Sequence, residues 1–537
     1  MVSAWLDGER PLEERVDAFV GDLDHAERVA IALGDFDALT SRGIPAPHYV
    51  DSGTGLRDVD GATAFPAGIA LAATFDATLA EAYGAAVGAE ARAAGYTVVL
   101  GPTLDLARDP RAGRIPEALG EDPHLSGLLG AAHVRGLQAQ HVIAQLKHYV
   151  AYNGEDRRTG YGLEPNRGDS VDVHVSTAVL QDSYLRPFEA AIRAGAWSMM
   201  GSYNRINGAY ACESAEILAI PRQQWGWQGF YCPDFLFAVR DDAKALAAGL
   251  DLGALGGAAG RTAEMVAAAP AEVVTALVAN LLRALIGSGL VEHTMTEPEP
   301  PSTPGHRQLA EDCVVAATVL LRNSDGALPF GDDVTSIAVI GPAGSDAIFV
   351  TGGSAGVSLV DERVIAPVAG IRARAGQRRI EVSQGSLGDV PLPLVPASAY
   401  ILPDGSGAGV EVQFVASNGR TWTETAPVID HTVAPGEAAG RWPRRWRARL
   451  TSHSTGAHQA QPHLWWPGHR PAGRRAGDGR LAGTRAVHPR APLPDAGGRR
   501  PRGPCARPPG DRLRTGPRDR HPADGPRPDA AARLAAP

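Results

Sequence analysis

Lysine is nearly absent from this chain of 537 residues, which contains two lysines, Lys147 and Lys244. Arginine supplies almost all of the other positive charge, although its planar guanidinium does not replace the compact, strongly hydrated charge of an ammonium group. Lys147 stands at the end of an apolar run, in the segment VIAQLKHYV, and is followed by His148. A lysine retained there indicates a site that needs the ammonium group; a strand end that faces solvent is the alternative.

Other absences exclude whole classes of protein. The four cysteines, at positions 212, 232, 313 and 505, lack the spacing of a metal site or of a disulfide framework, so we expect neither a metal nor a cofactor. No apolar run reaches the ~18 residues of a membrane span, and the N-terminus lacks the basic and apolar regions of a secretory signal. A net charge of −9 disfavours a nucleic-acid surface. These features predict a cytoplasmic protein without membrane or nucleic-acid partners.

The segment 459–537 lacks most of the residues that build a hydrophobic core. The last Tyr, Phe and Ile of the chain are Tyr400, Phe414 and Ile429, and no Glu follows Glu437. Arg, Pro, Ala and Gly dominate the segment, which cannot bury enough apolar surface to offset chain entropy and is expected to be a disordered basic tail. GC-rich codons encode these four residues, and the change falls inside a predicted β-domain. We therefore interpret the tail as out-of-frame translation, in preference to a basic tail that binds an acidic partner.

Short apolar runs alternate with helix-like segments over residues 1–290. The runs are PAPHYVD, YTVVLGPTLDL, VIAQLKHYV, AWSMMGSYN and GFYCPDF. This alternation predicts an α/β fold with a parallel sheet, whose commonest closed form is a (β/α)8 TIM-like barrel. Polar residues end the runs, and the C-terminal ends of barrel strands carry the active site. Those residues are Asp51, Asp105, Lys147, His148, Tyr203, Asn204 and Asp234.

The last of these runs, GFYC, is followed by Pro233-Asp234-Phe235. Burying an unpaired carboxylate is expensive, so an Asp at the end of a buried strand indicates a special role. Asp234 is either a catalytic residue at the rim of the barrel or the cap of the following helix, FAVRDDAKALAAG. The residues of this short stretch do not choose between the two readings.

A longer stretch carries a resemblance to a known family. SYNRINGAYACES, at 202–214, and the strand that ends in Pro233-Asp234-Phe235 together resemble the nucleophile region of glycoside hydrolase family 3. Members of this family have an SDW-like tripeptide at that strand end, so the Asp is kept and its neighbours differ. The resemblance implies that Asp234 is the catalytic nucleophile and that Tyr203 binds substrate.

Three further loops are similar to motifs of the same family. HYVDSGTGLRD is similar to TDGPxGVR, RDPRAGRIPEALGEDP to RDPRWGRNxExxGEDP, and KHYVAYNGEDRR to KHF(x)xNxxExxR. The resemblance implies that Asp51, Arg114, Lys147 and His148 bind sugar hydroxyl groups. The expected substrate is a β-linked oligosaccharide or an aryl or alkyl β-glycoside.

The chain changes character beyond the predicted barrel. Residues 291–305 are a linker rich in Pro, Thr and Glu. Residues 306–385 contain SIAVIGPAG and resemble the first part of the family's second domain, an α/β sandwich. Residues 386–458 alternate like β-strands with turn-forming Gly, and they resemble part of a PA14-type β-domain that some members carry as an insertion. The sandwich domain is therefore expected to be incomplete and interrupted, and the chain to be frameshifted or truncated after about residue 458.

A retaining glycosidase needs two carboxyl groups about 5–5.5 Å apart, one as nucleophile and one as acid and base. In members with a PA14 insertion, the resemblance places the acid/base Glu beyond that insertion, where this sequence has no Glu. We therefore expect a β-glucosidase-like retaining exo-glycosidase that is impaired by the loss of its general acid.

Three alternatives stay open at the level of the sequence. Within the family, the chain is alternatively a β-xylosidase or another exo-glycosidase. From a different class, it is a sugar-binding remnant without turnover. The pentapeptide GGSAG also fits the G-x-S-x-G elbow of a serine hydrolase around Ser354, although the Val-rich, Pro-terminated sequence after it makes a poor helix.

Overall fold

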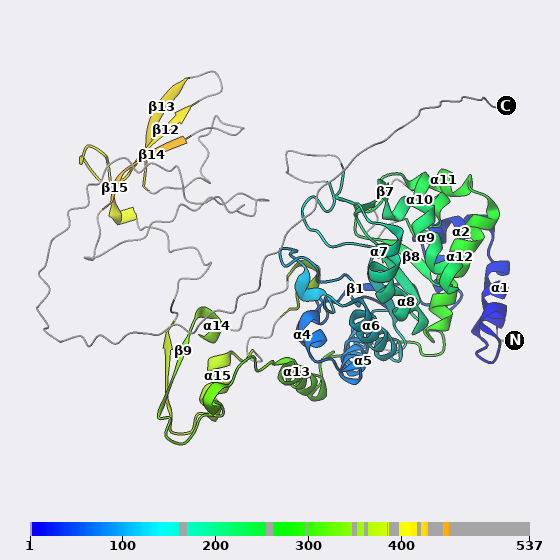
Figure 1. The fold of residues 1–537 in the computed structure, drawn as a ribbon. Helices are drawn as coiled ribbons and strands as arrows, with labels where there is room; N and C mark the ends of the chain where they lie inside the picture. The colour runs from blue at the N-terminus through cyan, green and yellow to red at the C-terminus, as the bar shows by residue number, and fades with distance from the viewer. Residues whose placement is uncertain are drawn as a thin grey trace, which may run out of the picture. The chain divides into compact units, whose positions relative to one another are not determined.

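The computed structural model describes most of the chain up to residue 450 (Figure 1). The predicted tail at 459–537 and parts of the predicted β-domain lie outside the described residues. No helix among the described residues has the length and apolar character that crossing a membrane requires. The described residues are 3–160, 169–253, 261–295, 299–345, 352–358, 364–383, 385, 397–415, 420–427 and 444–450.

A parallel sheet of five strands organises the N-terminal half. The strands pair in the order β1-β2-β3-β5-β8, so that strands which follow one another in the sequence are neighbours in space. Each strand coincides with one of the five apolar runs of the sequence, which confirms those runs as strands. They are β1 (Tyr49–Asp51), β2 (Val98–Leu100), β3 (Ile143–Tyr149), β5 (Ser198–Gly201) and β8 (Phe230–Pro233).

The sheet has five strands in the described residues, rather than the eight of a complete (β/α)8 barrel. In the sequence, helices α1, α2 and α3 precede β1, and helices α10, α11 and α12 follow β8. Their ends carry helix signals: Asp24 and Glu27 form a capping box at the start of α2, and Thr262 caps α11. The bounds are α1 (Leu12–Asp22), α2 (His25–Ala32), α3 (Asp37–Thr40), α10 (Asp242–Ala248), α11 (Ala263–Ala267) and α12 (Ala271–Gly287).

Helices between the strands cover the sheet, and α5 and α6 pack against each other most closely. A Cβ on Gly136 of α6 would lie 1.9 Å from the carbonyl oxygen of Glu81, and one on Gly84 of α5 would lie 2.2 Å from that of His133. Glycine therefore permits backbone contact between these two helices. The covering helices are α4 (Gly68–Ala73), α5 (Ala77–Ala93), α6 (Pro123–Gln138), α7 (Thr177–Val179), α8 (Arg186–Arg193) and α9 (Ala215–Trp225).

Alternate strand residues enter two apolar clusters, one on each side of the sheet. In β8, Tyr231 belongs to the cluster that contains residues of α5, α6, α8 and α9, whereas Phe230 and Cys232 belong to the cluster that contains residues of α1 and α12. Met199 and Met200 of β5 divide in the same way. Side chains of a strand alternate between its faces, so the sheet is buried on both faces, as parallel sheets usually are.

Beyond the linker, the described residues continue as an α/β segment and then as a β segment. Strands β9 and β10 pair in parallel, which agrees with the α/β character predicted for 306–385. Strand β12 pairs antiparallel with β13 and β14, and Phe414 stacks on Trp422 with ring centroids 5.1 Å apart. The β character of 386–458 is thus confirmed where it is described, and its PA14 type stays a prediction.

The remaining elements have the following bounds. The helices are α13 (Pro304–Ala317), α14 (Pro342–Ser345) and α15 (Pro367–Arg374). The strands are β4 (Asp172–Val173), β6 (Arg205–Ile206), β7 (Ala209–Tyr210), β9 (Ser336–Ile340), β10 (Arg379–Ser383), β11 (Tyr400–Ile401), β12 (Val410–Val415), β13 (Thr421–Ala426), β14 (Arg444–Arg447) and β15 (Arg449–Leu450). The single turns of helix are η1 (Ala4–Leu6), η2 (Ile115–Glu117), η3 (Leu180–Tyr184), η4 (Ala211–Glu213), η5 (Ser324–Gly326), η6 (Gly353–Ala355) and η8 (Ala397–Ala399).

A buried histidine in α6 makes the stability of this fold depend on pH. His133 lies against Tyr83, and burial lowers the pKa of His133 to about 4. A histidine whose pKa falls on folding, from about 6.5, is neutral in both states above that pH. As the pH drops toward 4 it destabilises the fold, because the unfolded state takes up the proton first. We expect this group to lower the free energy of unfolding by about 3 kcal/mol between pH 7 and pH 4.

The variant His133→Gln should flatten the pH dependence of urea unfolding in that range, as measured by circular dichroism. The exposed His124 at the start of the same helix provides the control, because His124→Gln should leave the pH dependence unchanged. An equally steep pH dependence in His133→Gln and in the wild type would show that His133 is not responsible.

Candidate active site

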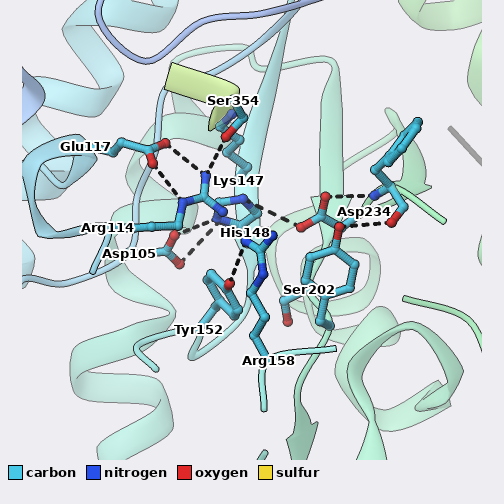
Figure 2. Close-up of polar contacts among 12 residues, drawn as sticks. Asp105, Arg114, Glu117, Lys147, His148, Tyr152, Arg158, Ser202, Asp234 and Ser354 are labelled. Carbon is cyan, nitrogen blue, oxygen red and sulfur yellow. Dashed lines mark hydrogen bonds and ion pairs between the residues drawn. The ribbon is translucent and has the colours of Figure 1, made fainter. Parts of the chain in front are cut away.

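The residues predicted from the sequence lie at the ends of the parallel strands or in the loops that follow them. This is the edge at which the loops that follow the strands meet. Figure 2 shows Arg114, Lys147, His148 and Asp234 among their neighbours. The structure places Asp51 at the end of β1, Arg114 in the loop after β2, Lys147 and His148 in β3, Tyr203 after β5, and Asp234 directly after β8.

Asp234 is buried and only partly satisfied by hydrogen bonds. Its Oδ1 accepts a hydrogen bond from the backbone N–H of Phe235 at 2.7 Å. Its Oδ2 has no hydrogen-bond partner among the described residues and lies 3.7 Å from Nε2 of His148. Burial raises the pKa of Asp234, whereas the Phe235 N–H and the charges of Arg114 and Lys147 oppose that rise.

The reading of Asp234 as a helix cap is wrong. The next helix, α10, begins at Asp242, and its cap is Asp241, whose side chain accepts a hydrogen bond from the backbone N–H of Lys244. Asp234 instead ends β8, where its own backbone N–H donates to the carbonyl of Gly201 in β5 at 2.9 Å. The sheet therefore fixes the backbone of Asp234, and its carboxylate is not used to cap a helix.

Lys147 is buried, with 1% of its side chain exposed, so the solvent-facing alternative for this strand end is also wrong. Its Nζ lies 3.4 Å from Oδ1 of Asp51, and Nη1 of Arg57 lies 3.5 Å from Oδ2 of the same carboxylate. A buried charge needs a partner to offset its lost hydration. Asp51 supplies that partner and links the ends of β1 and β3.

Arg114 lies in a second buried ion pair. Its Nε and Nη2 bind the two oxygens of Glu117 at 2.7 and 2.9 Å, a bidentate arrangement that fixes the guanidinium plane. Burial alone would raise the pKa of Glu117, but the hydrogen bond and charge of Arg114 outweigh burial and lower it. The guanidinium also lies over the ring of Tyr152, 5.8 Å from its centroid.

His148 connects two carboxylates. Its Nδ1 lies 2.7 Å from Oδ2 of Asp105, and its Nε2 faces Asp234. Burial lowers the pKa of His148, and the nearby positive charges of Arg114 and Lys147 act in the same direction. The ring is therefore held as neutral imidazole in a site that contains several cations.

Sequence reasoning missed several members of this cluster. Asp105 was noted as a polar strand end without a role, and the signal for it was its position after β2. Glu117, Tyr152 and Arg158 stand within the loops that matched family motifs, and Arg158 lies over the Tyr203 ring with 5.6 Å to its centroid. Motif spacing alone did not indicate that these side chains line the same site.

Ser354 reaches this site from the second half of the chain. Its Oγ lies 3.2 Å from Nη2 of Arg114, and the neighbouring carbonyl of Ala355 accepts a hydrogen bond from Oγ1 of Thr54 at 2.8 Å. An arginine stays protonated in proteins and cannot serve as a general base. This partner gives Ser354 no activation as a nucleophile, so the geometry of the described residues does not support the serine-hydrolase reading.

Residues 20–280 match the N-terminal domain of glycosyl hydrolase family 3. This chain belongs to glycosyl hydrolase family 3. It is 33% identical over 383 residues to a beta-glucosidase of Rhizobium radiobacter, which covers 67% of this chain and 44% of that protein. It is also 33% identical over 368 residues to a probable beta-glucosidase I of Aspergillus niger, which covers 66% of this chain and 43% of that protein. The chain thus spans less than half the length of these curated relatives.

Solved structures of beta-glucosidases share the fold. The beta-glucosidase of Kluyveromyces marxianus in complex with glucose has a TM-score of 0.63 and 26% identity, covering 77% of this chain and 52% of that chain. Beta-glucosidase 3B of Thermotoga neapolitana, in complex with alpha-D-glucose, has a TM-score of 0.59 and 28% identity, covering 68% of this chain and 55% of that chain. The match to the family includes the parallel sheet and the loops that carry the site.

The buried pair of Arg114 and Glu117 should stabilise this family 3 domain. Arg114→Met leaves the Glu117 carboxylate buried without its partner, and removing one member of a buried pair costs about 3 kcal/mol. The loss should be largest at pH 7 and should shrink as the pH falls below 5, because the isolated carboxylate then takes up a proton. Urea unfolding at the two pH values measures it.

The double variant Arg114→Met/Glu117→Gln should recover part of the lost stability, since no unpaired charge remains. Arg111→Met serves as the control, because Arg111 forms an exposed ion pair with Asp109 in the same loop, and its removal should leave the transition unchanged. Equal stability of Arg114→Met and the wild type at pH 7 would contradict the importance of the buried pair.

Proposed function

We propose that this chain is a β-glucosidase-like retaining exo-glycosidase in which Asp234 is the nucleophile. The observation that carries the proposal is the buried, unpartnered Oδ2 of Asp234 at the meeting point of the β1, β2, β3 and β5 loops. The names of the curated relatives, which are beta-glucosidases, support the same reaction class.

The position of Asp234 suits attack on an anomeric carbon. Its Oδ1 is held by the Phe235 N–H, which leaves the lone pairs of Oδ2 available to form a bond to the sugar. Retaining hydrolysis then proceeds through a glycosyl ester on Asp234, which water cleaves in a second step. The nearby charges of Arg114 and Lys147 favour the ionised carboxylate, which is the form that attacks.

The surrounding cations and rings suit a neutral, hydroxyl-rich ligand. Lys147 and Arg114 carry more N–H donors than their carboxylate partners use, so they can also donate to sugar hydroxyls. Asp51 can accept from hydroxyl groups while Lys147 and Arg57 balance its charge. We propose that Asp51, Arg114, Lys147, His148 and Tyr203 form the subsite for the non-reducing sugar.

We further propose that the chain is impaired because it lacks its general acid. Two carboxylates of the described loops are held by cations: Asp51 binds Lys147, and Glu117 binds Arg114, which lowers the pKa of Glu117. An acid with a lowered pKa stays ionised and cannot protonate a leaving group at neutral pH. The family's acid/base Glu is expected beyond the PA14-like segment at 386–458, and the given sequence contains no Glu after Glu437.

The identity of the nucleophile can be tested by covalent trapping. A 2-deoxy-2-fluoro-β-glucoside with a dinitrophenyl leaving group should label Asp234, because such a leaving group needs no proton. Mass spectrometry of peptides should find the label on Asp234 in the wild type and in Glu216→Gln, which removes an exposed carboxylate of α9. It should find none in Asp234→Asn.

Two results would overturn the assignment: a label on another carboxylate, or equal labelling of Asp234→Asn. A failure of the wild type to react with either aryl glucosides or aryl xylosides would favour a sugar-binding remnant. Faster reaction of the xyloside would favour a β-xylosidase.

The missing acid predicts a strong dependence on the leaving group. Loss of general acid–base catalysis costs typically ~10²–10⁴-fold, so alkyl glucosides and cellobiose should be almost inert, while dinitrophenyl glucoside should still form the glycosyl ester. Breakdown of the ester lacks its base, and azide, which needs no base, should accelerate turnover. Steady-state rates with and without azide measure both effects.

The decisive comparison is with a chain whose reading frame is restored after His458. Restoration should raise the rate on cellobiose by a factor in the range given above and should abolish the acceleration by azide. Equal rates of the two chains on cellobiose would show that the present chain has its acid/base, and that the tail is not a frameshift product.

A further inference from the structure

Three side chains from three strand ends form a row across the site (Figure 2). Asp105 in the loop after β2 faces Nδ1 of His148 in β3, and Nε2 of His148 faces Asp234 after β8. The distances are unequal, with 2.7 Å between Asp105 Oδ2 and Nδ1 and 3.7 Å between Nε2 and Asp234 Oδ2. The first is a hydrogen bond, and the second is too long for one.

The tautomer of His148 determines what this row of side chains can do, because the proton of the neutral ring is on either Nδ1 or Nε2. A neutral imidazole has one N–H donor and one acceptor nitrogen. A proton on Nδ1 donates to Asp105 and turns the Nε2 lone pair toward Asp234. A proton on Nε2 instead points an N–H at the nucleophile, which would stabilise its carboxylate and weaken its attack.

We propose that Asp105 is a positioning residue that holds His148 in the tautomer protonated on Nδ1, so that Nε2 faces the substrate and Asp234 as an acceptor. An ionised carboxylate can only accept hydrogen bonds, so a 2.7 Å contact with Asp105 requires the proton on Nδ1. The 3.7 Å between Nε2 and Oδ2 of Asp234 is too long for a hydrogen bond and fits the same state, in which Nε2 carries no proton. The inference rests on the proposed role of Asp234 as nucleophile.

The competing state places a second proton on the pair of Asp105 and His148. Burial raises the pKa of Asp105, and a neutral Asp105 carboxyl would donate to Nδ1 and leave the proton on Nε2. The charge of Arg114 and the backbone N–H of His148 stabilise ionised Asp105 and act against burial, although burial still raises the pKa of Asp105. The other charged or titratable groups around the pair are Lys147, Arg158, Glu117, Glu155, Tyr152, Tyr203 and Asp234.

The role of Asp105 would keep the nucleophile reactive and the sugar correctly placed. With Nε2 as acceptor, His148 can receive a hydrogen bond from a substrate hydroxyl. Its ring also lies against Tyr152, with centroids 4.8 Å apart, so it cannot turn freely to exchange its two nitrogens. The position of the proton, rather than the position of the ring, is then the property that Asp105 controls.

The substitution Asp105→Asn tests this role without changing the shape of the side chain. Oδ1 of Asp105 faces the backbone N–H of His148 at 3.4 Å, so the amide oxygen should take that place and the amide nitrogen should face Nδ1. That nitrogen is a donor, and it therefore forces the ring proton onto Nε2. Asp109→Asn is the matched control, because Asp109 is an exposed carboxylate of the same loop that binds Arg111.

Two measurements on the full chain give the outcome. Nitrogen-15 spectra of histidine-labelled protein, assigned by comparison with His148→Gln, should show Nδ1–H in the wild type and in Asp109→Asn, and Nε2–H in Asp105→Asn. The rate of trapping by the dinitrophenyl fluoro-glucoside should fall about tenfold or more in Asp105→Asn, as a wrong tautomer of a catalytic histidine does elsewhere. The acidic limb of its pH profile should move to lower pH, because an N–H beside Oδ2 stabilises the ionised nucleophile.

The possible failures are distinguishable. Nε2–H in the wild type overturns the inference, whether or not any variant folds. An unchanged trapping rate and pH profile in a folded Asp105→Asn also overturn it, even where its tautomer changes. A wild type with Nδ1–H that is not trapped on Asp234 would refute the proposed nucleophile instead, and with it the catalytic meaning of the tautomer.

Discussion

The burial of Lys147 is the constraint around which the site is built. An ammonium group with 1% of its side chain exposed must be matched by a negative charge, and Asp51 at the end of β1 provides it. The backbone of Lys147 is held as well, since its N–H donates to the carbonyl of Pro102 at 3.1 Å and its carbonyl accepts from the N–H of Leu104 at 2.6 Å.

These backbone bonds have a consequence for the neighbouring residues. The loop after β2 lies beside β3, so Asp105, one residue beyond Leu104, meets His148, one residue beyond Lys147. The same loop then continues to Arg114 and its ion pair with Glu117. The backbone pairing of residues 102–104 with Lys147 thus places the Lys147 ammonium group and the Asp105–His148 pair in the same site. A shift of register in this pairing would separate His148 from Asp105 and Lys147 from Asp51.

The sequence predicted the five strands and the edge of the sheet, at the C-terminal ends of the strands, where the candidate site lies. Both follow from local patterns, because buried parallel strands are continuous apolar runs and their ends must become polar where loops meet solvent. The described residues form five strands of this sheet, whereas the eight of a complete barrel followed from the expected fold class and not from a count of apolar runs. The pairing of Arg114 with Ser354 could not be predicted, because 240 residues separate the two and nothing local to either indicates the other.

Asp251 shows what distinguishes a reactive buried carboxylate from a structural one. Like Asp234, it follows an apolar stretch, is buried, and has a pKa that burial raises. Both of its oxygens are satisfied, however: Asn280 donates to Oδ1 at 2.8 Å, and Arg222 and the Tyr231 N–H donate to Oδ2 at 2.5 and 2.6 Å. Its hydrogen bonds fasten β8 to the helices behind it.

Asp234, just beyond the C-terminal end of β8, has one oxygen that accepts a hydrogen bond and one that lies 3.7 Å from Nε2 of His148 without a hydrogen-bond partner among the described residues. Leaving a buried acceptor unsatisfied costs about 1–3 kcal/mol, and more for a charged group. The fold tolerates this cost because Asp251, Tyr231 and the ladder to β5 fix the strand independently of Asp234. Sequence composition does not separate the two aspartates, whereas their hydrogen bonds do. Those of Asp251 are the bonds of a structural residue, and the open oxygen of Asp234 is what the proposed nucleophile needs.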